Sequence, residues 1–322
     1  MNQIGEVIHI GPGAHFRLER EIAKASFGEV WAATWVEAGS RVALKMVRQD
    51  EMAAYPEFAD VWPASLQREI AFLQTVRAPH LVYFIRHGHW QGLPVLVLEE
   101  MDTSLSCLMQ ADHLQSSVVP YTGSRQSANP AIRQHQQALH WLRQIANGLA
   151  VLHGHGLRHL DLKPHNLLLT KDFGPGLGRR IKVADFGECK NRDEVWHQVV
   201  GTPGWQAPEQ FFPLPDFEHE LVYQTDHRAD LFALGLLYFF MVTGQKTEFA
   251  LCMMQLHQQA MENAAWLVKD DNACHLSAQD RDRFMAGAPA KAWGLLQALL
   301  AHQPAQRPDS AQTVIHMIDS LV

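Results

Sequence analysis

Three short stretches carry polar side chains whose types and spacing could do chemistry. They are His-Leu-Asp-Leu-Lys-Pro-His-Asn at 159–166, Asp-Phe-Gly at 185–187 and Gly-Thr-Pro-Gly-Trp-Gln-Ala-Pro-Glu at 201–209. Asp161 and Asn166 follow the spacing D-x-x-x-x-N, with which one loop can offer a base to a hydroxyl group and a neutral ligand to a metal ion. One such stretch alone would be a weak signal, whereas the ordered set is a strong one.

In this order the stretches resemble the catalytic loop, the magnesium-binding turn and the end of the activation segment of Hanks-type (eukaryotic-like) serine/threonine protein kinases. The resemblance covers roughly residues 16–320 and implies ATP and Mg²⁺ as cofactors. It implies Asp161 as the base for the substrate hydroxyl and Lys163 as the cation that neutralises the moving phosphoryl group. Asn166 and Asp185 would be the magnesium ligands. Asp-Leu-Lys-Pro at 161–164 is typical of serine/threonine rather than tyrosine kinases.

Val-Ala-Leu-Lys at 42–45 resembles the kinase strand whose lysine pairs with the α- and β-phosphates and with a helix glutamate. That lysine would be Lys45, and Glu69 is the best candidate for its partner. Glu57 ranks lower, because it precedes Pro63 and lies outside the apolar periodicity of the helix expected at 65–76.

By the same resemblance, the adenine slot would lie between the two lobes. Val30 and Ala43 would form its roof and Leu168 its floor. The Glu99 carbonyl and the Met101 amide would bind adenine, with Leu98 as the gatekeeper.

The phosphate loop departs from the family pattern. The kinase sequence G-x-G-x-x-G aligns with Ala-Lys-Ala-Ser-Phe-Gly at 23–28, so Ala23 and Ala25 replace two glycines and Gly28 retains the third. Each alanine adds a methyl group where glycine allows close backbone approach to phosphate. The sequence therefore predicts weakened but not abolished ATP binding.

A second Asp-Phe-Gly tripeptide, at 172–174, follows Asn166 too closely to be the magnesium turn, and it opens a Gly/Pro-rich loop. Asp185, by contrast, follows the apolar run 181–184. We expect no metal role for Asp172.

Leu160 stands where most relatives carry an arginine that binds a phosphorylated activation segment. Residues 188–200 contain no Ser, Thr or Tyr. Both observations predict an activation segment that is ordered without phosphorylation. Thr202 is expected as a substrate-side hydroxyl near Asp161 and Lys163. His165 replaces a glutamate that reads basic substrates in some relatives, which weakens the case for a basic consensus.

Further residues match structural positions of the family. Glu209 should pair with Arg307, and Asp230 should brace the catalytic loop from an apolar helix. The 201–209 stretch, which shapes a peptide platform in the family, favours a protein substrate over a small molecule.

The predicted fold is α+β, with a small N-terminal β-rich lobe (about 16–100) holding one key helix and a larger helical lobe (about 101–322). We expect the chain, 1–322, to be a single kinase catalytic domain with a polar insertion at about 110–133. Strands are expected at 16–22, 29–35, 41–47, 81–85 and 93–98, and helices at 65–76, 101–109, 136–153 and 229–242.

Composition sets limits on partners and location. The 322 residues are 47% hydrophobic and 19% charged, with a formal net charge of −7, which disfavours nucleic acid as a partner. Four cysteines without a C-x-x-C pair indicate a reducing, cytoplasmic setting. The longest apolar run, 231–242, is too short to span a bilayer, so no membrane insertion is expected. The sequence leaves the oligomeric state open.

Two functional interpretations stand at this point. The leading one is an active serine/threonine protein kinase. The alternative is a pseudokinase, an ATP-binding or scaffolding module without turnover, which Ala23, Ala25 and Leu160 favour. Because a non-catalytic protein has no chemical need for the intact polar set, the active kinase is preferred.

Overall fold

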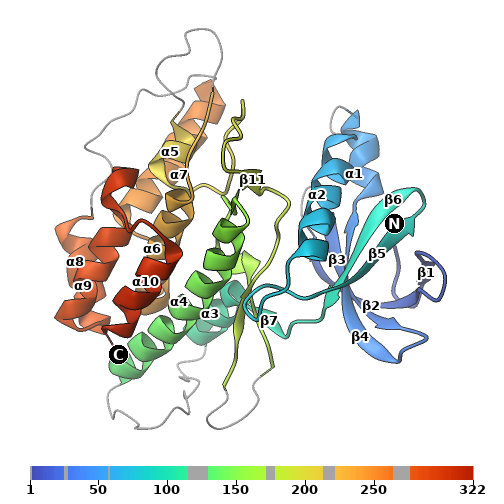
Figure 1. Cartoon of the computed structure of the whole chain (residues 1–322), viewed down its shortest axis with the longest axis horizontal. Coiled ribbons are helices and arrows are strands. Elements are labelled where there is room, and N and C mark those ends of the chain that lie inside the picture. The colour runs from blue at the N-terminus through green and yellow to red at the C-terminus, as the bar shows by residue number, and fades with distance from the viewer. Residues whose placement is uncertain are drawn as a thin grey trace. The chain divides into compact units, whose positions relative to one another are not determined.

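The computed structural model describes residues 2–24, 28–56, 59–114, 130–171, 178–212, 222–263 and 276–321 (Figure 1). The chain divides into two compact units. Unit 1 comprises Met1–Asp102 and Ala184–Gly187, and unit 2 comprises Thr103–Val183 and Glu188–Val322. The first break falls close to the lobe boundary predicted near residue 100. The sequence did not indicate that Ala184–Gly187 would group with unit 1, because this grouping depends on contacts between residues far apart in the chain.

Unit 1 is built on one six-stranded antiparallel sheet in the order β1-β2-β3-β4-β6-β5 (Figure 1). The strands are β1 (Val7–His9), β2 (His15–Lys24), β3 (Gly28–Trp35), β4 (Ser40–Val47), β5 (Phe84–Trp90) and β6 (Leu93–Glu99). The turn between the last two has Gln91 at φ 51° and Gly92 at φ 83°. Two consecutive residues with positive φ are typical of a tight hairpin, whose twist matches that of its strands.

The two faces of this sheet differ because successive side chains of a strand point to opposite sides. One face carries the apolar core of the unit, which includes Phe16, Trp31, Leu44 and Val97. Residues paired directly across antiparallel strands share a face, and Val30 pairs with Lys45. The register therefore places Val30 and Lys45 on the face opposite this core.

β5 lies three residues later than the strand expected at 81–85. Its sequence, Phe-Ile-Arg-His-Gly-His-Trp, mixes polar and aromatic residues and gives little apolar signal. A Cβ at Gly88 would lie 2.1 Å from the carbonyl oxygen of Ile10, so only glycine allows the N-terminal segment to pack there. Strand β1, at the other end of the strand order, was not predicted.

Two helices complete the N-terminal part of unit 1, namely α1 (Gln49–Ala54) and α2 (Val61–Thr75). α2 begins four residues before the predicted helix. Pro63 lies in its first turn, where a missing backbone N–H costs no hydrogen bond. The proline is therefore compatible with a helix that begins at Val61.

Unit 2 is mainly helical (Figure 1). Its helices are α3 (Leu105–Leu114), α4 (Pro130–Gly154), α5 (Pro208–Phe211), α6 (Arg228–Thr243), α7 (Glu248–Asn263), α8 (Ala278–Gly287), α9 (Ala290–Leu299) and α10 (Ala311–Asp319), with short 3₁₀ turns at Pro164–Asn166 and Pro304–Gln306. α6 is buried almost all round, packs against α4, α8 and α9, and ends at Gly244, whose left-handed φ of 70° caps it.

Short strands hold the loops of unit 2. β7 (Thr103–Ser104), β9 (Leu167–Leu169) and β10 (Ile181–Val183) form one small sheet, and β8 (Leu157–Arg158) pairs with β11 (Lys190–Asn191). The helix expected from residue 101 begins only at Leu105, because Thr103 and Ser104 pair with β9 instead. It also runs into the predicted polar insertion, of which residues 115–129 lie outside the described part.

Candidate active site

Within unit 1, β4 and α2 bring together three of the residues predicted for nucleotide chemistry. Nζ of Lys45 donates a hydrogen bond to Oε2 of Glu69 at 2.6 Å and another to Oδ1 of Asp185 at 2.6 Å. Oε1 of Glu69 accepts the backbone N–H of Phe186 at 3.1 Å. Glu69 therefore lies where the predicted lysine partner should be. Glu57, the lower-ranked candidate, lies outside the described residues.

The charges of this cluster influence one another. Burial by itself would lower the pKa of Lys45, but the carboxylates of Asp185 and Glu69 outweigh burial and raise it. Burial raises the pKa of Glu69, which the attraction of Lys45 offsets only in part. Lys45 therefore stays protonated at neutral pH and can attract an anion such as a phosphate group.

The register of the sheet places Ala23, Val30, Ala43 and Leu98 on the face that carries Lys45. Ala23 pairs with Val30, and Ala43 pairs with Leu98. Ala43 and Lys45 are two positions apart on β4 and therefore share a face. The predicted apolar lining and the predicted phosphate-binding lysine thus point to the same side of one sheet.

The structure describes only part of the predicted phosphate loop at 23–28, and it places Glu99 and Met101, the residues expected to bind adenine, at and after the end of β6. Ala23 lies near the end of β2 and Gly28 begins β3, while Ala25 lies outside the described residues. Glu99 ends β6, where its backbone N–H donates to the carbonyl of Tyr83 at 3.0 Å, and Met101 follows it. The second tripeptide, at Asp172, also lies outside the described residues.

In unit 2, the loop between β8 and β9 gathers a hydroxyl, a carboxylate and an ammonium group. The hydroxyl of Thr202 donates to Oδ1 of Asp161 at 2.6 Å, and Nζ of Lys163 donates to that hydroxyl oxygen at 2.8 Å. Nζ of Lys163 also donates to Oδ2 of Asp161 at 2.7 Å. The predicted proximity of Thr202 to Asp161 and Lys163 is confirmed. Leu168, the predicted adenine floor, is half-buried on β9 of the same unit.

The donor set suits a hard cation. The amide nitrogen of Asn166 donates to the backbone oxygen of Asp161 at 2.9 Å and to its Oδ2 at 3.2 Å. With the nitrogen engaged in this way, the oxygen is the acceptor end of the Asn166 amide. Asp185 belongs to unit 1, where its carboxylate is 44% exposed. Amide and carboxylate oxygens are each of a ligand type that suits Mg²⁺.

Asp230 braces the catalytic loop from α6, as predicted. Its carboxylate accepts the backbone N–H groups of His159 and Leu160, each at 2.8 Å, and a hydrogen bond from His153 at 2.8 Å. Leu160 has a φ of 61°, a conformation that a leucine rarely adopts. The buried carboxylate therefore stabilises a strained backbone next to Asp161.

Sequence reasoning missed Arg158, which is 1% exposed. Its guanidinium donates to the carbonyls of Thr225, Asn191 and Glu194, the last at 3.2 Å, and lies over the ring of Trp196. An arginine two residues from Leu160 was the available signal. Its importance depends on carbonyl partners that no local pattern reveals.

Gln210 is a second residue that was missed. It is 1% exposed, and its Nε2 donates to the carbonyl of Leu160 at 2.7 Å and to that of Val200 at 3.2 Å. Gly201 lies so close to the carbonyl oxygen of Leu160 that a Cβ at this position would be 2.5 Å from it. The end of the 188–200 segment is thus tied to the catalytic loop by uncharged hydrogen bonds.

The predicted pair of Glu209 and Arg307 is confirmed. Nη1 of Arg307 donates to Oε1 of Glu209 at 2.5 Å and Nη2 donates to Oε2 at 2.9 Å. The Arg307 side chain is fully buried, and it also donates to the carbonyls of Ala301, Arg228 and His302. This two-pronged pair anchors α5, at the end of the 201–209 stretch, to the C-terminal part of unit 2.

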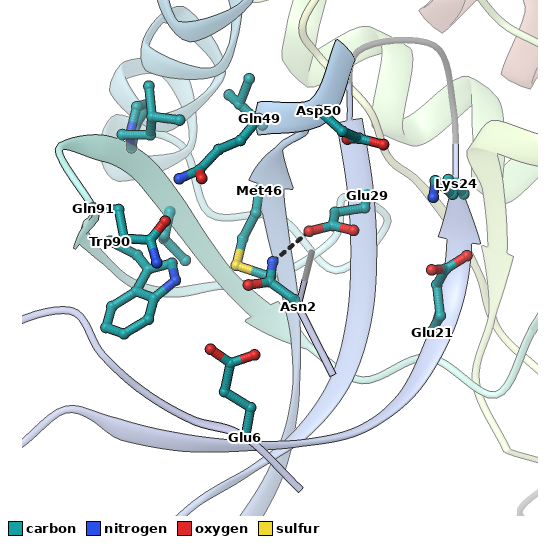
Figure 2. A pocket seen from close by; sticks show the side chains of 14 residues that line it. Asn2, Glu6, Glu21, Lys24, Glu29, Met46, Gln49, Asp50, Trp90 and Gln91 are labelled. Carbon is teal, nitrogen blue, oxygen red and sulfur yellow. Dashed lines mark hydrogen bonds between the residues drawn. The ribbon is translucent and has the colours of Figure 1, made fainter. Parts of the chain in front are cut away.

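A cavity of about 160 Å³ lies elsewhere in unit 1 (Figure 2). It is lined by Glu6, Glu29, Met46 and Trp90, among others, and Asn2 donates to Glu29 at 2.5 Å within it. The strand register places Glu29 and Met46 on the face opposite Lys45. Its carboxylates would repel a triphosphate, so this cavity is not the predicted nucleotide site.

Both a family model and curated relatives of this chain are protein kinases. The protein kinase domain family model matches residues 16–318. The chain is 28% identical over 235 residues to the serine/threonine-protein kinase Pkn1 of Myxococcus xanthus, covering 71% of this chain and 29% of that protein. It is 27% identical over 294 residues to ATG1b of Arabidopsis thaliana, covering 91% of this chain and 35% of that protein. The chain thus spans about a third of these relatives' length.

Among solved structures, the kinase domain of Mycobacterium tuberculosis PknI, crystallised as a double mutant, matches with a TM-score of 0.63 at 21% identity, covering 100% of this chain and 99% of that one. This similarity supports the predicted two-lobed fold. None of the described helices is long and apolar enough to cross a membrane. Because the family match extends over nearly the whole sequence, this chain belongs to the protein kinase domain family.

Proposed function

We propose that the chain transfers the γ-phosphate of ATP to serine or threonine hydroxyl groups of proteins. The Thr202 hydroxyl supports this proposal most directly. It lies 2.6 Å from the Asp161 carboxylate and 2.8 Å from the Lys163 ammonium. An aliphatic hydroxyl therefore fits between a base and a cation in unit 2, which is the environment that an attacking serine or threonine needs.

In the proposed step, Asp161 accepts the proton of the substrate hydroxyl as its oxygen attacks the γ-phosphorus. The bond between that phosphorus and the oxygen bridging to the β-phosphate breaks, and ADP leaves. Lys163 neutralises charge on the phosphoryl group during transfer. Its ammonium is already oriented by Asp161 at 2.7 Å, so little reorganisation is required.

Unit 1 would supply the nucleotide side of the reaction. Lys45, oriented by Glu69 at 2.6 Å, would hold the α- and β-phosphates. Asn166 and Asp185 would hold Mg²⁺, which neutralises phosphate charge when bound. The adenine contacts expected of Val30, Ala43, Glu99, Met101 and Leu168 belong to the same proposal, as does the phosphate loop formed by Ala23, Ala25 and Gly28.

The alternative is a pseudokinase that binds ATP or a partner without turnover. The replacement of two phosphate-loop glycines by Ala23 and Ala25 favours it. The hydrogen-bonded arrangement of Asp161, Lys163 and Asn166 favours the active enzyme, because a binding module needs no oriented base.

Transfer of labelled phosphate from ATP to a generic protein substrate separates the two. We expect incorporation on serine and threonine that falls at least about 100-fold in Lys45→Ala and in Asp161→Ala. Equal incorporation by wild type and both variants would reveal a contaminating kinase. No incorporation by folded wild type would favour the pseudokinase.

We further propose that the activation segment is ordered without phosphorylation. Arg158 holds the carbonyls of Asn191 and Glu194, and Gln210 holds that of Val200. These built-in donors satisfy backbone acceptors in a segment that many relatives order by pairing a phosphate with an arginine.

Phosphatase treatment tests this part of the proposal. Activity should be unchanged after treatment, and mass spectrometry should find Thr202 unmodified. A loss of activity that tracks removal of phosphate from Thr202 would overturn it.

A further inference from the structure

A half-buried lysine beside the 201–209 stretch has no carboxylate partner among the described residues. Lys246 follows α6 in the loop that leads to α7. Its Nζ lies 4.5 Å from the centroid of the Trp205 ring and donates to Sδ of Met254 at 3.4 Å. A thioether is a weak acceptor, whereas an ammonium group has three donors. Lys246 therefore retains hydrogen-bonding capacity for an anion.

Lys246 packs closely against Gly204. Gly204 has a φ of 80°, and a Cβ there would lie 2.7 Å from Nζ of Lys246 and 2.8 Å from Sδ of Met254. Glycine therefore allows the lysine and α7 to approach the backbone of the 201–209 stretch. Lys246 is held against this stretch by close packing, unlike a solvated surface lysine.

This position is close to the proposed acceptor site. The backbone N–H of Trp205 donates to the carbonyl of Thr202 at 3.0 Å, and the Thr202 hydroxyl contacts Asp161 at 2.6 Å. Since consecutive Cα atoms are about 3.8 Å apart, Gly204 lies within about 8 Å of Thr202. A substrate side chain bound at Lys246 would thus belong to a residue close in sequence to the serine or threonine that is phosphorylated.

The described charges around Lys246 leave it available to an anion. Burial lowers the pKa of Lys246, and among the residues that the structure describes no carboxylate counteracts this. Glu248, two residues along the chain, is engaged by Arg283 at 3.6 Å. An incoming acidic group would therefore meet a cation that no carboxylate of the described part of the chain engages.

We propose that Lys246 is a specificity-determining residue that binds an acidic side chain of the protein substrate next to the phosphorylated serine or threonine. The proposal rests on the function proposed above and names its substrate class. The ligand chemistry is a carboxylate or a phosphate monoester on a peptide. Leu251 and Met254 are exposed one helical turn apart on α7, and they would give neighbouring apolar side chains a surface to contact.

Peptides with a single acceptor serine provide the test. At each position close to the acceptor serine, four residues are compared in turn: glutamate, phosphoserine, glutamine and lysine. No peptide contains a second serine or threonine that could be phosphorylated. At the best position we expect wild type to prefer glutamate over glutamine by about tenfold in kcat/KM, chiefly through KM, which corresponds to about 1.4 kcal/mol. The phosphoserine series shows which anionic source is preferred.

Variants then assign the preference to Lys246. In Lys246→Gln and Lys246→Met the ratio should fall to about one, and in Lys246→Glu it should shift toward lysine. The control is Lys291→Gln on α9, a lysine that donates to the carbonyl of Leu321 at 2.6 Å and should leave the ratio unchanged. An acidic preference that persists in folded Lys246→Gln, or none in wild type, would overturn the proposal.

A binding measurement separates this proposal from the proposed function. Fluorescence anisotropy of labelled peptides is recorded with Asp161→Asn, alone and combined with Lys246→Gln. Tighter binding of the glutamate peptide that is lost in the combined variant supports recognition by Lys246, even if no peptide is phosphorylated. Equal binding of glutamate and glutamine peptides, alongside measurable phosphate transfer, would reject only the role of Lys246.

Discussion

At the scale of single residues, Thr202 links the base and the cation of unit 2. Replacing it with valine keeps the shape but removes the hydroxyl that Asp161 and Lys163 share. Loss of one hydrogen bond to charged groups costs about 1.5–3 kcal/mol, so we expect phosphate transfer to fall about 10- to 100-fold, mainly in kcat. Thr202→Ser should restore most of the activity. A Thr202→Val enzyme with wild-type kcat would show that the hydroxyl is dispensable.

The phosphate loop offers a second prediction at this scale. Ala25→Gly should tighten ATP binding about tenfold, or about 1.4 kcal/mol, because it removes a methyl group near the phosphates. Calorimetric titration with an ATP analogue measures the change. Weaker binding would contradict the role assigned to the alanine.

At the scale of elements, Asp230 couples α6 to the catalytic loop, and its titration makes this coupling depend on pH. Burial alone would raise its pKa, but the hydrogen bond and charge of His153 and the contacts with His159 hold it below its usual value. A carboxyl group whose pKa is lowered on folding contributes stability above its unfolded pKa of about 3.9. That contribution is lost as the pH falls through the folded pKa.

We therefore expect Asp230→Asn to lower the free energy of unfolding by about 1–3 kcal/mol at neutral pH, because the two backbone N–H groups bond to different carboxylate oxygens and an amide replaces one of these with an NH₂ donor. The difference from wild type should stay constant above about pH 5 and shrink below about pH 4. Urea denaturation over this range measures it. A difference that does not change with pH would contradict the titration of Asp230.

Arg158 couples β8 to the activation segment. Arg158→Met leaves the carbonyls of Asn191, Glu194 and Thr225 without their shared donor. We expect several-fold faster trypsin cleavage after Lys190 and after Arg192, because local opening of the segment becomes easier. The exposed Arg281→Met variant should be cleaved at the wild-type rate. Equal protection in both variants would remove the support that Arg158 gives to a phosphorylation-independent segment.

At the scale of the whole molecule, Glu209 and Arg307 join segments 98 residues apart. Glu209→Ala leaves a buried guanidinium without its carboxylate, which costs about 3–5 kcal/mol of unfolding free energy. The matched control is Asp319→Ala, which removes the carboxylate from the exposed pair of Arg143 and Asp319. It should cost at most about 1 kcal/mol of unfolding free energy. Urea denaturation of both variants distinguishes them, and similar losses would show that burial is not the deciding factor.

Much of the fold followed from local patterns. The strands β2, β3, β4 and β6 and the apolar helix α6 were predicted because alternation and apolar runs act over a few positions. β1, the late start of β5 and the early start of α2 were not. They depend on contacts such as Gly88 with Ile10 and on the place of Pro63 within the first helical turn.

The sequence by itself determined the family, the order of the chemical motifs and the identity of Lys45, Asp161, Asn166 and Asp185 as candidates, because these signals lie within short stretches. Only the tertiary structure decided the partners. It paired Lys45 with Glu69, buried Arg158 among backbone carbonyls, tied Gln210 to Leu160 and left Lys246 beside Gly204. Such contacts join residues that are far apart in the chain, and their energies depend on burial and on which acceptors packing brings within reach.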